Sequence, residues 1–160
     1  MAIRNVRIDG DPILRKKSKE VSEVTPRVRE LISDMYDTMY DSDGVGIAAV
    51  QVGILKRIVV IDDREGNKFT LINPVIKNPT GEQLGMEGCL SVPQKQGRVK
   101  RYNELELEYT DESGERHEVV VNEFLARIVQ HELDHLDGVL YSDRAEEMYD
   151  LSELEDISEE

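Results

Sequence analysis

The chain has 160 residues, of which 39% are apolar and 34% charged, and its formal net charge at pH 7 is −14. This composition suits one compact domain, which we expect over residues 1–143, followed by an acidic C-terminal tail over residues 144–160 that joins the domain or frays. The negative charge disfavours broad binding to nucleic acids or anionic membranes. No apolar run approaches the roughly 20 residues that a membrane-spanning helix needs.

The single cysteine excludes an internal disulfide and predicts a reducing compartment. The N-terminus carries charge without an apolar core after it, so we expect no signal peptide. Together these features predict a cytoplasmic protein.

Residues 25–76 predict one helix and two strands. Thr25 is a capping residue and Pro26 suits the first helical position, after which apolar residues follow helical spacing. A continuous apolar run and the turn residues after it then predict a buried strand. The predicted elements are a helix over 26–41, a loop containing Gly44 and Gly46, a buried strand over 57–62, and a strand over 69–76 interrupted at Pro74.

The second half of the chain predicts a hairpin and a second helix. Alternating apolar residues predict a strand over 99–109, and a turn at 111–114 joins it to a return strand over 118–121. Asn122 then caps a helix that is apolar around much of its circumference and that Gly138 can end. This order predicts an α+β fold, with mainly antiparallel β-sheets packed around the central second helix and with an N-terminal helix beside them.

The second helix carries the pattern His131, Glu132, His135. Positions i and i+4 share one helix face, so both imidazoles can point at one metal ion. Glu132 is turned by about a hundred degrees and can handle a proton on a metal-bound water. The chain has three histidines in all, and this segment uses two of them. The remaining one, His117, has no partner in sequence, and we expect it at the surface.

Two histidines leave a metal site incomplete, because a catalytic metal usually takes three protein ligands. The candidate third ligand is Cys89, since a thiolate suits Zn²⁺ or Fe²⁺ and Gly88 before it lets the backbone approach closely. Taken alone, a lone cysteine is more often a small buried hydrophobe. Beside a histidine pair that lacks a third ligand, metal ligation is the favoured interpretation.

Two other functions compete with this interpretation. Zinc endopeptidases share the two-histidine motif and usually take a third ligand downstream of the helix, which here would be Asp143 or Glu146. A non-catalytic metal- or peptide-binding domain is the second alternative.

The glycines of residues 44–51 (GVGIAAVQ) have the wrong spacing for a phosphate loop, and no lysine ends the loop.

Three segments in order complete a family pattern: residues 44–51 (GVGIAAVQ), 87–91 (EGCLS) and 130–135 (QHELDH). Together they resemble the motifs of the peptide deformylase family, and the resemblance extends over residues 1 to about 143. It implies a metal-dependent hydrolase that removes the formyl group from N-formyl-methionine at the N-terminus of nascent bacterial-type polypeptides and releases formate.

The resemblance also assigns roles to the residues of these motifs. Cys89, His131 and His135 would hold one divalent metal ion, natively Fe²⁺, with a water in the fourth position; Zn²⁺, Ni²⁺ and Co²⁺ accept the same ligands. Glu132 would act as the general base and then as the acid. The site would lie in a monomer that acts on formylated chains emerging from the ribosome in the bacterial cytoplasm, with no specificity for nucleic acid and no membrane.

Further residues would stabilise or bind the substrate. The Gln51 amide and the Leu90 backbone N–H would face the developing oxyanion. Glu87 and Arg101 would form a buried pair that braces the cysteine segment, the alternative for Arg101 being a surface charge on a strand. Substrate contacts are expected from Val45, Gly46 and Gly88 on the substrate backbone, and from Phe124 and Ile128 in the pocket for the methionine side chain.

Overall fold

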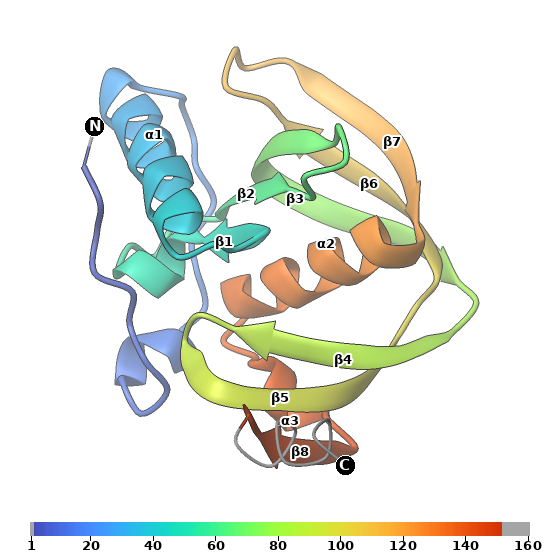
Figure 1. Cartoon of the computed structure of the whole chain (residues 1–160). Coiled ribbons are helices and arrows are strands. Elements are labelled where there is room, and N and C mark those ends of the chain that lie inside the picture. The colour runs from blue at the N-terminus through green and yellow to red at the C-terminus, as the bar shows by residue number, and fades with distance from the viewer. Residues whose placement is uncertain (1, 152–160) are drawn as a thin grey trace.

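The computed structural model describes residues 2–151 and places helix α2 between two antiparallel β-sheets (Figure 1). The larger sheet has the order β1-β2-β3-β6-β7 and the smaller one the order β4-β5-β8. The predicted α+β class and the central position of the second helix are confirmed. In chain order the elements are η1 (Pro12–Arg15), α1 (Pro26–Asp41), β1 (Gly46–Ala48), η2 (Ala49–Val52), β2 (Ile58–Asp62), β3 (Lys68–Thr80), β4 (Gln83–Cys89), β5 (Val92–Arg101), β6 (Glu104–Thr110), β7 (Arg116–Asn122), α2 (Glu123–Leu136), α3 (Tyr141–Arg144) and β8 (Glu147–Asp150).

Helix α1 begins and ends where the sequence predicts. The Thr25 hydroxyl accepts a hydrogen bond from the Val28 N–H at 3.2 Å, and Pro26 occupies the first turn. The apolar face of α1 packs on one face of the larger sheet, where Ile58 and Val60 of β2 meet it.

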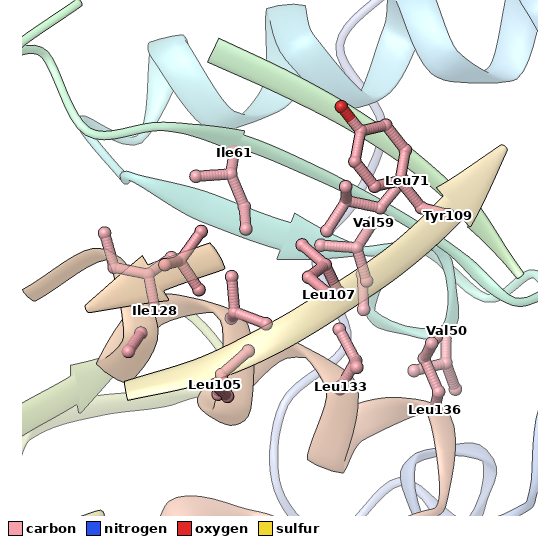
Figure 2. Packing of buried hydrophobic residues seen from close by; sticks show 14 residues of the cluster. Val50, Val59, Ile61, Leu71, Leu105, Leu107, Tyr109, Ile128, Leu133 and Leu136 are labelled. Carbon is pink, nitrogen blue, oxygen red and sulfur yellow. The ribbon is translucent and has the colours of Figure 1, made fainter. Parts of the chain in front are cut away.

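The opposite face of the larger sheet packs on α2 (Figure 2). Strand β2 is therefore buried on both faces, which explains why its sequence is continuously apolar rather than alternating. The hydrophobic cluster between α2 and this sheet includes Val50, Val59, Ile61, Leu71, Leu105, Leu107, Tyr109, Ile128, Leu133 and Leu136.

The ends of α2 differ in how far they follow the prediction. Gly138 has a φ of +76°, and a Cβ there would lie 2.5 Å from the Arg15 carbonyl oxygen, so only glycine fits after the helix. Asn122 occupies the N-cap position, but its side chain makes no capping hydrogen bond. The predicted cap is thus confirmed in position and wrong in its bonding.

The single strand predicted over 99–109 is wrong. The chain leaves β5 after Arg101 and enters β6 at Glu104, so the segment belongs to two strands in different sheets. Gln130 of α2 holds this crossing, because its side-chain amide bonds the Tyr102 N–H and C=O, each at 2.9 Å. Alternation continues through both strands, so periodicity alone does not reveal the crossing.

Other differences concern short or extended strands. Residues 46–48, predicted as loop, form β1, and the unpredicted β4 carries Cys89 at its end. The predicted interruption at Pro74 is confirmed as a register shift between Ile72 and Val75 in β3. The start of the acidic tail forms β8 on β5, whereas residues 152–160 lie outside the described residues. Among residues 2–151, no helix is long and apolar enough to cross a membrane.

Candidate metal centre

The structure brings Cys89, His131 and His135 together from two elements. Cys89 ends strand β4, the histidines lie one turn apart on α2, and the three ligand atoms all lie within 4.8 Å of one another. The sulfur lies 3.4 Å from His135 Nε2. One sulfur and two imidazole nitrogens form a donor set that suits Zn²⁺ or Fe²⁺. These side chains can therefore hold one divalent ion.

Glu87 orients the first histidine ring. Its carboxylate accepts a hydrogen bond from His131 Nδ1 at 2.7 Å, which leaves Nε2 as the free ring nitrogen. Arg101 donates to both Glu87 oxygens, at 2.9 Å each, and is 5% exposed. The predicted Glu87–Arg101 pair is confirmed, and the surface alternative for Arg101 is wrong.

Charges around these groups shift their pKa values in different directions. Burial would raise the pKa of Glu87, but hydrogen bonds from Arg101 and His131 outweigh it and lower the pKa to about 2. Burial lowers the pKa of His135, and the positive charges of His131 and Arg101 lower it further. For His131, burial lowers the pKa, but the interactions with Glu132, Cys89 and Glu87 outweigh burial and raise the pKa above its usual value.

Glu132 lies in an enclosed position beside the two histidines. Burial raises its pKa to about 7, and its Oε1 atom has no hydrogen-bond partner among the described residues. A Cβ at Gly46 of β1 would lie 2.7 Å from Glu132 Oε2, so the glycine makes room for the carboxyl group. A carboxyl group that titrates near neutral pH suits general acid–base chemistry.

Gln51 lies next to Cys89. Its Oε1 accepts from the Ala48 N–H at 2.9 Å, which fixes the amide orientation. Its Nε2 lies 3.1 Å from the Ser91 hydroxyl and 3.5 Å from the Cys89 sulfur. The amide N–H donors are thus held next to the sulfur.

A cavity of about 580 Å³ opens over these groups. His131 and Glu132 line it together with Cys89, while Phe124 at its rim is 53% exposed and Ile128 is buried. The residues predicted to contact substrate all line this cavity: Val45, Gly46, Gly88, Phe124 and Ile128. The two predicted oxyanion donors, Gln51 and Leu90, line it as well.

Two residues that contact the site, Arg127 and Tyr141, were not predicted from the sequence. Arg127 donates to Glu87 Oε2 at 2.5 Å, and the Tyr141 ring stacks on His131 with centroids 5.7 Å apart. Arg127 lies one helical turn before His131, and this spacing could have placed it on the same face. Tyr141 follows the end of the helix, and no sequence pattern places it on a histidine.

Other singled-out residues have different partners. Asp134 pairs with Arg101 and Arg144. Asp143, a third ligand in the endopeptidase alternative, pairs with Arg15 at 2.5 Å. Within residues 2–151, the groups close enough to share a metal include neither Asp143 nor Glu146; the other such group is Asp111, Glu115 and His117 on the β6–β7 hairpin.

Comparisons with known proteins agree in pointing to one family. The family model described as polypeptide deformylase matches residues 3–150. A peptide deformylase of Agathobacter rectalis is 53% identical over 91% of this chain and 92% of its own length. One from Caldanaerobacter subterraneus subsp. tengcongensis is 50% identical over 99% of each chain.

Solved structures show the same relationship. The crystal structure of peptide deformylase from Thermotoga maritima superposes with a TM-score of 0.89 at 37% identity, covering 92% of this chain and 100% of that chain. A peptide deformylase from Synechococcus elongatus, in complex with actinonin, gives a TM-score of 0.86 at 42% identity, covering 90% and 79%.

Proposed function

Since the chain belongs to the polypeptide deformylase family, we propose that Cys89, His131 and His135 hold the metal ion on which the family's hydrolysis depends. The protein is an enzyme that hydrolyses the N-formyl group of formylmethionine at the start of nascent polypeptides, and it releases formate. The observation that carries the assignment of residues is the convergence of one thiol and two imidazoles within 4.8 Å of one another. Of these, Cys89 and His131 line the cavity together with the buried Glu132.

The proposed ion is a single divalent cation, natively Fe²⁺. The donor chemistry fits, because a thiolate and two neutral imidazoles also accept Zn²⁺, Ni²⁺ and Co²⁺. A bound cation of this kind supplies Lewis acidity, which lowers the pKa of water towards about 7. Glu87 supports the site by holding His131 through Nδ1.

Glu132 is the proposed general base and acid. It takes a proton from the attacking water and returns it to the amine that leaves when the formyl C–N bond breaks. Its burial, the lack of a partner for its Oε1 atom among residues 2–151 and its pKa of about 7 support this role. Proton transfer of this kind contributes about 10²–10⁴ in rate.

The Gln51 amide and the Leu90 backbone N–H are the proposed oxyanion donors. Negative charge gathers on the formyl oxygen as water adds to the carbon, and a donor fixed in advance stabilises that charge. The bond from Ala48 to Gln51 Oε1 holds the amide with its N–H groups towards Cys89. Loss of one such donor typically costs about 10²–10³ in rate.

Two sheet edges meet at the cavity and suit an extended peptide. Strand β1 is at one edge of the larger sheet and β4 is at one edge of the smaller sheet. An edge strand has free backbone groups that a peptide can pair with. We therefore assign backbone pairing to Val45, Gly46 and Gly88, and the methionine pocket to Phe124 and Ile128.

The proposed setting of the enzyme is the bacterial cytoplasm. There it would act, as one domain and as a monomer, on formylated chains that emerge from the ribosome. Sedimentation of the protein alone would test the monomer, and sedimentation with ribosomes would test the ribosome contact.

The deciding variant is Glu132→Gln, which keeps the size of the side chain and removes its titrating carboxyl group. We expect unchanged folding and metal content, and formate release from a formyl-Met peptide reduced by a factor of about 10² or more. The matched control is Glu146→Gln, which should retain activity and metal. Unchanged turnover in Glu132→Gln would reject the acid–base role, and loss of metal in Glu146→Gln would favour the endopeptidase ligand set.

A further inference from the structure

Arg127 is a buried guanidinium on α2 that the proposed chemistry leaves unused. Its side chain is 7% exposed, and its Nη1 donates to Glu87 Oε2 at 2.5 Å. Its Nε donates to the Gln83 side chain at 3.2 Å, and Nη1 also donates to the Val99 carbonyl at 3.1 Å. So many bonds from one buried side chain indicate a fixed geometry rather than a snorkelling surface charge.

The Glu87 carboxylate joins this arginine to the proposed metal ligand. Its Oε1 accepts from His131 and from Arg101, and its Oε2 accepts from Arg101 and from Arg127. Arg127 and His131 are four residues apart on α2, so the two side chains hold Glu87 from successive turns of one helix. Removal of Arg127 leaves Arg101 as the donor to Oε2 and so weakens the hold on the carboxylate whose Oε1 orients the imidazole.

The same guanidinium also links α2 to both strands beneath it. It donates to the Gly85 carbonyl of β4 at 3.5 Å and to the Val99 carbonyl of β5 at 3.1 Å. A Cβ at Gly85 would lie 3.1 Å from Arg127 Nη2, so the glycine leaves the space that the side chain fills. Strand β4 ends in Cys89 and α2 carries both histidines, so this link spans the two elements that supply the three ligands.

The geometry points to Arg127 as a positioning residue of the metal site, acting through Glu87 on His131 and through β4 on Cys89. This inference rests on the proposed function, because it takes these side chains as ligands. Partners that bond a metal ligand directly, as Glu87 does, typically carry about 10–100-fold in metal affinity, and Arg127 acts through such a partner. Loss of Arg127 should therefore weaken metal binding before it changes the fold.

The test compares Arg127→Met with Arg57→Met, using Co²⁺ as the probe. Arg57 is the matched control, since its guanidinium is 16% exposed and bonds the Ser18 and Leu136 carbonyls away from Glu87. Chelator competition measures the Co²⁺ dissociation constant, and visible absorption reports the ligand geometry around Co²⁺. We expect Arg127→Met to weaken binding by about 10-fold, the lower end of that range, and to shift the Co²⁺ bands, and Arg57→Met to do neither.

Glu87→Gln supplies the second half of a double-mutant cycle. If Arg127 acts through Glu87, adding Arg127→Met to Glu87→Gln costs less affinity than adding it to the wild type. If the two substitutions reduce the Co²⁺ affinity by independent factors that simply multiply in the double variant, the route through Glu87 is overturned. Arg127→Lys, which keeps the charge and loses the planar fork, should show an intermediate loss and gives the answer if Arg127→Met does not fold.

The outcomes separate this inference from the function on which it rests. Wild-type protein that binds Co²⁺, with Arg127→Met and Arg127→Lys equal to Arg57→Met, overturns the positioning role alone. Wild-type protein that binds no Co²⁺ refutes the proposed site itself, and the positioning role with it.

Discussion

Gly46 lies close against the Glu132 side chain, and this contact gives a prediction at the scale of single residues. A Cβ on Gly46 would lie 2.7 Å from Glu132 Oε2 and 2.9 Å from its Cγ, so Gly46→Ala must displace the carboxyl group. A misplacement of about 1 Å can cost about 10²-fold in rate. We expect kcat to fall by about that factor, with one metal per chain retained, as measured by formate release and metal analysis.

Gly44→Ala is the control for that variant. Its Cβ would meet the flexible end of Leu90 at 3.3 Å and would be in ordinary contact with Met39 at 3.5 and 3.6 Å, so its effect on kcat should be small. Equal kcat in Gly46→Ala and wild type would show that the close approach to Glu132 has no role in turnover.

The sequence predicts the site residues unevenly. The spacing of His131 and His135 is a local property of one helix, so it is visible without a structure. Cys89 is predicted as a ligand because the histidine pair lacks a third one. The long separation between Cys89 and the histidines in the chain gives no support for this prediction. Helical spacing could have placed Arg127 on the face of His131, but its bond to Glu87 of β4 is a contact between separate elements that spacing does not encode. The contact of Tyr141 with His131 has no signal in the sequence at all.

At the scale of elements, Asp34 of α1 holds the N-terminal segment. Its carboxylate accepts from the Ala2 N–H and from Arg4 Nε, each at 2.9 Å. Burial would raise the pKa of Asp34, but these two donors outweigh it and lower the pKa. Because the folded-state pKa lies below the unfolded value of about 3.9, the ionised group stabilises the fold above that pH, and the contribution is lost as pH falls through the folded-state pKa.

Urea unfolding of wild type and Asp34→Asn at a series of pH values measures this contribution. The difference in free energy of unfolding should be constant between about pH 5 and 7 and should shrink below about pH 4. Arg4→Gln should remove part of the same contribution, since it deletes one of the donors. A difference that stays constant down to about pH 3 would contradict the assignment.

Gly97 of β5 lies where α3 and β8 cover the strand. A Cβ there would lie 2.6 Å from Met148 Sδ, 2.9 Å from Ala145 Cβ and 3.0 Å from Tyr141 Cε2. Overpacking of this kind costs about 1–3 kcal/mol, so Gly97→Ala should lower the free energy of unfolding by that amount. Met148→Ala added to Gly97→Ala should restore part of the loss. An unchanged free energy of unfolding in Gly97→Ala would show that α3 and β8 move away from the added methyl group without a cost in stability.

Elements with local signals were the ones that the sequence predicted well. Helix α1 has its cap and its proline at the start, and the β6–β7 hairpin has its turn residues between two alternating strands. The crossing between β5 and β6 is fixed by Gln130 of a distant helix, and no local pattern marks it. The short β1 exists because it pairs with β2, which is a tertiary effect.

At the scale of the whole molecule, the net charge of −14 gives a prediction about salt. Like charges repel across a compact fold, whereas exposed ion pairs contribute little, so screening should stabilise the protein. Raising NaCl from about 0.05 M to about 0.5 M shortens the screening length and should raise the Tm. The variant carrying Glu146→Gln and Glu147→Gln has less negative charge and should respond less; a Tm that falls with salt would mean that attractive pairs dominate.

The arrangement of the whole chain explains why the site lies where it does. Helix α2 lies between the two sheets (Figure 1). Its two histidines are therefore buried, and Cys89 at the end of β4 lies next to them. The α+β class follows from the order of elements in the sequence. The division of the strands into two sheets does not, because it is set by the crossing at residues 102–103.

The most direct measurement is a titration of metal-free protein with Fe²⁺ in the absence of air, following bound metal and formate release in the same samples. The account predicts that activity rises in proportion to bound metal and stops at one equivalent per chain, and that Cys89→Ala takes up no tightly bound ion. Full turnover without bound metal, or a Cys89→Ala variant that binds one equivalent as tightly as the wild type, would contradict it.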